Sequence, residues 1–235
     1  NGMPRVSEAT KAEHRKRLLA SAATEFASLG LQGARVDNIS LSAGLAKGTI
    51  YNYFDSKEHV FRAVIAAWWD RAAEGRSSIP DDASTVERLR VVLEADMAVV
   101  EEQEDFARTA FREVLLAGVE GARQLLPASD PLDDALVQIM ADGQQRGELR
   151  ADLTVAGLVR LFAAMVNGLL FERWLPDSDV RIADIPDLAI DHFMTGASTH
   201  PVWAGCVPRK RSAPSNTVSR LNVPSAAHAT LPPWF

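Results

Sequence analysis

One short polar run near the N-terminus combines the side chains best suited to binding a nucleic acid. The run covers residues 47–53, and a further lysine stands four residues after it. Together they hold cations, hydroxyl groups, an amide and a glycine: Lys47, Gly48, Thr49, Tyr51, Asn52, Tyr53 and Lys57. Ammonium and hydroxyl groups bind phosphate oxygens, whereas lysine and asparagine can also read guanine and adenine in the major groove. Glycine lets the backbone come close to the duplex. These residue types predict contacts with DNA.

The run lies where a helix-turn-helix would place its second helix. Two short helices are predicted at residues 37–43 and 47–54, and Gly44 stands between them, where a tight turn favours a residue that can adopt positive φ. The second helix of this motif enters the major groove with its N-terminal residues nearest the bases. The pattern therefore predicts that the side chains from Lys47 onward face DNA.

Longer helices are predicted on both sides of this motif. The first begins at Thr10, which stands in capping-box spacing with Glu13, and ends at Gly30. The helix after the motif is capped by Ser56 and is expected to join two domains.

The rest of the chain as far as residue 196 also reads as helices separated by short breaks. No stretch alternates apolar and polar residues over a length that would predict a strand. The sequence therefore predicts an all-α fold of about nine helices. Further helix starts are predicted at Ser84 with Glu87, at Asp105, at Asp130 with Pro131, at Asp152 and after Pro186.

The charge is distributed unevenly along the chain. Residues 1–62 carry nine Lys and Arg against six Asp and Glu, and residues 63–196 carry twelve against twenty-five. A basic head on an acidic body suits a protein that binds phosphates at one end, although the small positive excess is also compatible with ordinary surface charge. We predict a flexible N-terminus at 1–9, a helix-turn-helix domain at 10–62 and a helical ligand-binding and dimerisation domain at 63–196.

Residues 197–235 are predicted to form a disordered tail. They contain six of the twelve prolines of the chain, four basic residues and no acidic residue. The basic run 208–211 is compatible with a second nucleic-acid patch, but a solvated tail, or residues added during cloning, explains it more simply.

Two features favour a cytoplasmic protein. Cys206 is the only cysteine, which excludes a disulfide framework and is typical of a reducing compartment. The longest nearly uncharged apolar run, residues 161–171, is shorter than the ~20 residues that span a bilayer, so no membrane segment is predicted.

Residues 35–61, RVDNISLSAGLAKGTIYNYFDSKEHVF, closely resemble the DNA-binding signature of the tetracycline-repressor-like (TetR) family. The resemblance places Thr49, Tyr51, Tyr53 and Lys57 on the family's backbone contacts, and Lys47, Gly48 and Asn52 on its base-facing positions. Tyr51 could pack against the protein as well as bind DNA. Arg35 departs from the family's usual hydroxyl residue; the helix cap could move to Asp37, which would leave Arg35 as a phosphate ligand.

The resemblance also implies a C-terminal bundle that binds a small molecule and dimerises through its last two helices, here near residues 155–175 and 186–196. An apolar pocket needs large apolar side chains and few polar ones. The candidates are Phe106, Phe111, Leu115, Met140, Phe162, Met165, Asn167 and Trp174. Each apolar member could equally be plain core. Glu113 could select a cationic ligand or lie on a solvated face.

The sequence therefore predicts a ligand-responsive repressor that a small apolar molecule releases from a palindromic operator. No cofactor and no metal is expected, because the five histidines are scattered without metal-ligand spacing. The alternatives are a helical-bundle enzyme and a DNA-binding protein that responds to no ligand.

Overall fold

The computed structural model describes residues 7–76, 79–80, 82–128 and 131–198, and within them the chain is all-helical, as predicted. The predicted tail from residue 199 and residues 1–6 of the predicted N-terminal segment lie outside this part. Eight α-helices and two 3₁₀ turns follow one another in the described residues: α1 (Glu8–Gly33), α2 (Val36–Ser42), η1 (Thr49–Asn52), α3 (Lys57–Gly75), α4 (Thr85–Glu102), α5 (Glu104–Leu125), α6 (Pro131–Gln145), α7 (Val155–Arg173), η2 (Ile182–Asp184) and α8 (Ile185–Ala197).

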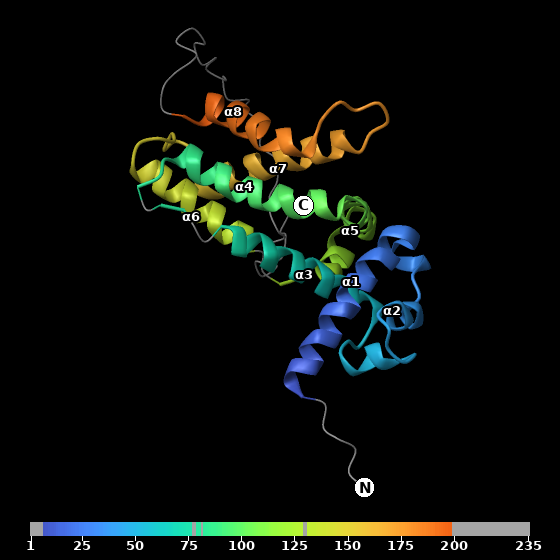
Figure 1. Ribbon diagram of the computed structural model, residues 1–235. Helices are drawn as coiled ribbons and strands as arrows, with labels where there is room; N and C mark the ends of the chain where they lie inside the picture. Colours follow the sequence, from blue (N-terminus) through green and yellow to red (C-terminus); the bar gives the residue numbers. More distant parts are fainter. Residues whose placement is uncertain (1–6, 77–78, 81, 129–130, 199–235) are drawn as a thin grey trace, which may run out of the picture.

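The helices divide between two ends of the molecule that α3 and α5 connect (Figure 1). One buried cluster holds the apolar side chains of α1 to α3 together with those of α5, and a second joins α4, α6, α7 and α8. The rings of Phe26 in α1 and Phe61 in α3 meet edge to face at 5.1 Å, and both contact Phe106 of α5. The first cluster therefore contains residues from both sides of the boundary predicted between residues 62 and 63, because α3 and α5 pack against the helix-turn-helix.

Local sequence signals set most helix starts. Ser56 Oγ accepts a hydrogen bond from the backbone N–H of His59, and Ser84 and Glu87 form both halves of the predicted capping box. Several predicted starts are shifted by one to three residues: α5 begins at Glu104 and not at Asp105, and α8 begins at Ile185 and not after Pro186. α1 is capped by Ser7 in place of Thr10, and α7 by Thr154 in place of Asp152, because in each case the hydroxyl reaches the N–H three residues on.

The predicted end of the first helix at Gly30 is a kink. Gly30 has φ 68° and ψ 177°, and the helix resumes and runs to Gly33. A carboxylate from α5 stabilises the break, because Glu113 Oε1 accepts the N–H of Leu31 at 3.3 Å. Glu113 was predicted to lie on a solvated face or to contact a ligand. Its side chain is instead 15% exposed and also pairs with Arg112.

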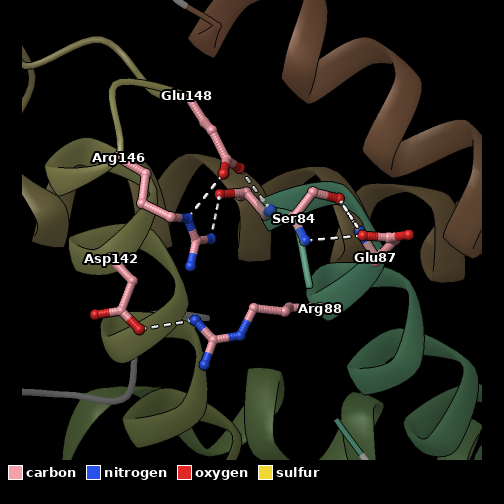
Figure 2. A network of polar contacts seen from close by, with 7 residues as sticks. Ser84, Glu87, Arg88, Asp142, Arg146 and Glu148 are labelled. Atoms are coloured by element: carbon pink, nitrogen blue, oxygen red, sulfur yellow. Dashed lines mark hydrogen bonds and ion pairs between the residues drawn. The ribbon is translucent and has the colours of Figure 1, made fainter. Parts of the chain in front are cut away.

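A polar network fixes α4 against α6 (Figure 2). Glu148 Oε2 accepts the N–H of Thr85 at 2.6 Å, and Arg146 Nε donates to Glu148 Oε1 at 2.7 Å. Burial alone would raise the pKa of Glu148, but these hydrogen bonds and the nearby guanidinium outweigh it and lower the pKa. Arg88 donates to Asp142 at 2.7 Å and completes the connection. The network holds together two helices that line the cavity described below.

α7 is the most apolar long helix of the described chain. With a mean hydropathy of 1.6 it is long and apolar enough to cross a membrane by length and composition alone, a test that core helices of soluble proteins also pass. Only 28% of this apolar window is buried within one copy of the chain. Its stripe Leu161, Ala164, Gly168 and Phe171 is exposed, so α7 has an apolar face that no other part of the described chain covers.

Candidate nucleic-acid interface and ligand cavity

The polar run after α2 is held out from the core by buried residues on both sides of it. Ile39, Ile50 and Phe54 are at most 2% exposed and belong to the first cluster. Ser40 is fully buried, and its Oγ accepts the backbone N–H of Ile50 at 3.2 Å. This bond joins α2 to η1 and was not expected from the sequence.

The predicted helix over residues 47–54 is wrong in extent, because the structure forms only the 3₁₀ turn Thr49–Asn52 there. Gly48 has φ 82° and ψ −6°, a left-handed conformation that ends any helix coming from Lys47. Gly44 also has positive φ, 68°, as the predicted turn requires. The second helix of the motif is therefore a single tight turn that follows two glycine-dependent bends.

Four of the predicted DNA-contacting residues are exposed. Tyr51 is 59% exposed and Asn52 is exposed beside it, which argues against the alternative that Tyr51 packs inward. The Lys47 side chain is 68% exposed and its Nζ lies 3.1 Å from Asp37 Oδ2. Arg35 is exposed where α2 begins. Gly48 and Thr49 are half-buried between these groups.

Two other predicted contacts also bind the protein itself. The Nζ of Lys57 donates to the carbonyl oxygens of Gln32 at 2.9 Å and Ala34 at 3.3 Å, so its charge stabilises the end of α1. An ammonium group has three donors, which leaves a third N–H for a phosphate. Tyr53 is half-buried, and its hydroxyl lies 3.3 Å from His14 Nδ1.

The suggested cap at Asp37 is absent, since α2 has no side-chain cap. Instead, Glu25 of α1 accepts hydrogen bonds from the backbone N–H of Arg35 at 3.1 Å and from Asn38 Nδ2 at 3.2 Å. The side chain of Arg35 does not cap α2. Its guanidinium therefore remains available to bind a phosphate of the DNA backbone.

The first half of α1 supplies cations next to the polar run. The guanidinium of Arg15 lies 5.6 Å from the ring centroid of Phe54, and Arg17 donates to the carbonyl of Ala43 at the end of α2. The basic opening turns are visible in the sequence, but their contacts are not, because the partners lie more than twenty residues away.

Replacing Ser40 with alanine is expected to lower the free energy of unfolding by about 1–3 kcal/mol, because the N–H of Ile50 would lose its partner in a buried place. The matched control is Ser42→Ala, which removes an exposed hydroxyl from the same helix. Chemical denaturation at equal protein concentration measures both variants. Equal midpoints for the two would show that the Ser40 bond does not hold the polar run in place.

An apolar cavity of about 200 Å³ lies between α3, α4, α5, α6 and α7. Four of the eight predicted ligand-binding residues line it: Phe111, Phe162, Asn167 and Trp174. Phe111 and Trp174 meet edge to face at 5.5 Å, and Trp174 Nε1 donates to Glu104 Oε1 at 3.2 Å. The structure therefore brings together half of the predicted set.

The other four predicted ligand-binding residues do not line this cavity. Phe106 fills the first cluster with Phe26, Phe61 and Trp68, and Met140 is fully buried in the second cluster. Met165 packs against the outside of the second cluster. Leu115 is 50% exposed, because α5 turns the adjacent Val114 inward. Size and apolarity alone did not distinguish core from cavity wall.

The polar wall of the cavity is not predicted by any signal in the sequence. Arg76 and Asp96 form an ion pair whose side chains are 8% and 12% exposed, and both residues line the cavity, as does Trp68. Burial raises the pKa of Asp96 to about 6, against the opposing effect of the Arg76 guanidinium.

Comparison with known proteins connects both parts of the chain to one family. The sequence family of bacterial regulatory proteins of the tetR type matches residues 18–64, and the tetracyclin repressor-like C-terminal domain matches residues 82–196. Together they cover more than half of the chain. The chain belongs to the TetR family.

Relatives and solved structures agree with this assignment. FasR, a transcriptional activator from Mycolicibacterium smegmatis, is 26% identical over 161 residues, which cover 68% of this chain and 74% of FasR. BepR, a repressor from Brucella suis, is 24% identical over 182 residues, covering 73% and 85%. FadR from Bacillus subtilis, solved with stearoyl-CoA, has a TM-score of 0.65 at 18% identity and covers 77% of this chain and 98% of its own; it shares the fold.

This TetR family member is a DNA-binding transcriptional regulator and not an enzyme, which removes the alternative of a helical-bundle enzyme. Its relatives include an activator as well as repressors.

Proposed function

We propose that this TetR regulator is a cytoplasmic, ligand-responsive repressor that binds a palindromic operator as a homodimer. One observation carries the DNA-binding part: the exposed run around Lys47, Tyr51 and Asn52 is fixed by a buried hydrogen bond and two left-handed glycines. A preformed polar turn loses little conformational entropy when it enters the major groove.

Within this proposal, the DNA contacts divide into two groups. Lys47, Gly48 and Asn52 are assigned to the bases, as the resemblance to the TetR signature implies. The phosphate contacts are Arg35, Thr49, Tyr51, Tyr53 and Lys57. Contacts with phosphates position a protein on the duplex, whereas contacts with base edges give specificity.

Dimerisation through α7 and α8 accounts for the exposed stripe on α7. Leu161 is 55% exposed and Phe171 is 52% exposed, and Ala164 and Gly168 lie between them at alternating spacings of three and four residues. This spacing repeats along one helix face, as in a helix pair, and the small residues allow close approach of a partner helix. A second copy would bury this face, and two short reading turns would then define a palindrome.

The cavity is placed to communicate with the DNA-binding end by two helices. α3 contributes Trp68 and Trp69 to the cavity and begins at Lys57, which is bonded to the end of α1. α5 contributes Phe111 to the cavity and, through Glu113, holds the kink of α1. A ligand that moves either helix would therefore change the position of the head, and favour a dimer spacing that does not fit DNA.

If Glu113 couples the cavity to the DNA-binding end, the variant Glu113→Ala should bind the operator but release it poorly when effector is added. A small-molecule library screened by thermal shift supplies the effector, and operator affinity is then titrated with and without saturating effector. In Glu113→Ala, we expect the effector-induced loss of affinity to shrink at least fivefold, because typical coupling factors of ~5–150 depend on such contacts.

The control for this experiment is Glu120→Ala, which removes an exposed glutamate from the same helix. It should respond to effector as the unmodified protein does. If saturating effector leaves the operator affinity of the unmodified protein unchanged, the ligand-responsive function is wrong. If no library member shifts the melting temperature, the alternative of a ligand-independent DNA-binding protein gains support.

A further inference from the structure

Buried polar atoms without a protein partner are concentrated in the wall of the cavity. Within the described residues, four side-chain atoms of cavity-lining residues are shielded from solvent and have no hydrogen-bond partner in the protein: Trp68 Nε1, Arg76 Nε, Asp96 Oδ2 and Asn167 Nδ2. Buried polar groups normally have partners, because a buried donor or acceptor that forms no hydrogen bond has lost its bonds to water without replacement. A bound molecule that supplies these partners restores the missing hydrogen bonds.

The unpartnered groups are mainly donors. Indole and guanidinium nitrogens can only donate, and the amide nitrogen of Asn167 donates as well. Asp96 Oδ2 is the single acceptor of the four. A matching ligand must therefore carry an acceptor oxygen.

The charge of this wall is balanced within the protein. Arg76 and Asp96 pair with each other and lie in a region with little solvent exposure. An anionic ligand would bring a second negative charge to a guanidinium that is already neutralised, and burying an unpaired charge is costly. An uncharged acceptor such as a carbonyl group meets the donors without this cost.

The remaining lining sets the size and the character of the ligand. The cavity of about 200 Å³ is lined mostly by apolar side chains, and cavities of ~150 Å³ hold a molecule the size of benzene. We propose that the cavity binds an uncharged, ring-sized apolar molecule with one carbonyl oxygen, which accepts hydrogen bonds from the Asn167 amide and the Trp68 indole. This inference rests on the ligand-responsive function proposed above.

Three probes of equal shape test the chemistry: cyclohexyl methyl ketone, isopropenylcyclohexane and cyclohexanecarboxylate. Calorimetric titration of the full chain should give a Kd for the ketone that is about tenfold lower than for the alkene, with the carboxylate weakest. A carboxylate that binds most tightly, an alkene that binds as tightly as the ketone, or the failure of all three to bind overturns the proposal.

Two variants test whether the Asn167 amide and the Trp68 indole donate to the ketone oxygen. Asn167→Leu and Trp68→Phe should each remove most of the preference for the ketone over the alkene. Trp174→Phe is the matched control, because Trp174 also lines the cavity but its N–H already donates to Glu104. It should change the affinities for ketone and alkene by the same factor. Unchanged ketone preference in both Asn167→Leu and Trp68→Phe contradicts the assignment.

A spectroscopic measurement provides an independent readout. In ¹⁵N spectra, the indole N–H signal of Trp68 should move when the ketone binds and stay nearly in place with the alkene, whereas that of Trp174 responds little to either. Operator affinity is measured on the same samples. Normal operator binding by a protein that binds no probe would refute this inference and leave the assignment as a DNA-binding regulator intact.

Discussion

Replacing Leu161 and Phe171 together with glutamate is expected to convert the protein to a monomer and to weaken operator binding about 100-fold or more. Both side chains lie on the exposed stripe of α7, and two carboxylates there would have to be buried without partners in the dimer. A monomer has one reading turn, so it loses the gain of ~10²–10⁴ that comes from linking two binding modules. Light scattering and operator titration measure the two effects.

The control for the dimer is Leu116→Glu. Leu116 is 76% exposed and belongs to α5, so it is not part of the α7 stripe. This variant should remain dimeric and bind the operator normally. A Leu161→Glu, Phe171→Glu double variant that remains dimeric at micromolar concentration would exclude α7 as the centre of the interface.

The second large effect is expected from the exposed turn. Replacing Lys47 and Asn52 together with alanine should reduce affinity for the matched operator by about 10–100-fold and change affinity for scrambled DNA little, because each good base contact contributes ~1–3 kcal/mol of discrimination. Some of the Lys47 contribution is offset by its ion pair with Asp37, because that carboxylate competes with the bases for the ammonium group.

Arg35→Ala provides the contrast. As a phosphate contact, Arg35 should contribute similarly on matched and scrambled DNA, and its loss should reduce the slope of log affinity against log salt by about 1. Equal losses on matched and scrambled DNA for the Lys47→Ala, Asn52→Ala variant would contradict a base-reading role for this turn.

The features that sequence predicted correctly depend on neighbouring residues. The all-helical fold and the caps at Ser56 and Ser84 follow from periodicity and from side chains that bond a backbone N–H three residues away. The turn at Gly44 follows from the freedom of one glycine. Such signals are complete within a few residues, so they can be read without the fold.

The features that sequence missed depend on distant partners. The kink at Gly30 involves Glu113, which is 82 residues from Leu31, and the polar wall of the cavity joins Arg76 of the α3 end to Asp96 of α4. The 3₁₀ turn at Thr49–Asn52 replaces a longer helix because Gly48 is left-handed and Ser40 bonds to Ile50. Phe106 and Met140 were predicted to line the cavity but lie in the core for a related reason. Only the packing of distant helices decides whether a large apolar side chain faces a cavity or another side chain.

The polar run that begins at Lys47 is expected to read the major groove, and methylation interference tests this role most directly. Dimethyl sulfate modifies guanine N7, which lies in the major groove. On an operator selected by the purified protein from random DNA, we expect modified guanines to block binding in two half-sites about one helical turn, or a multiple of it, apart. The Lys47→Ala, Asn52→Ala variant should lose this interference. Binding that is insensitive to guanine N7 methylation, or interference that persists unchanged in the variant, would contradict the account.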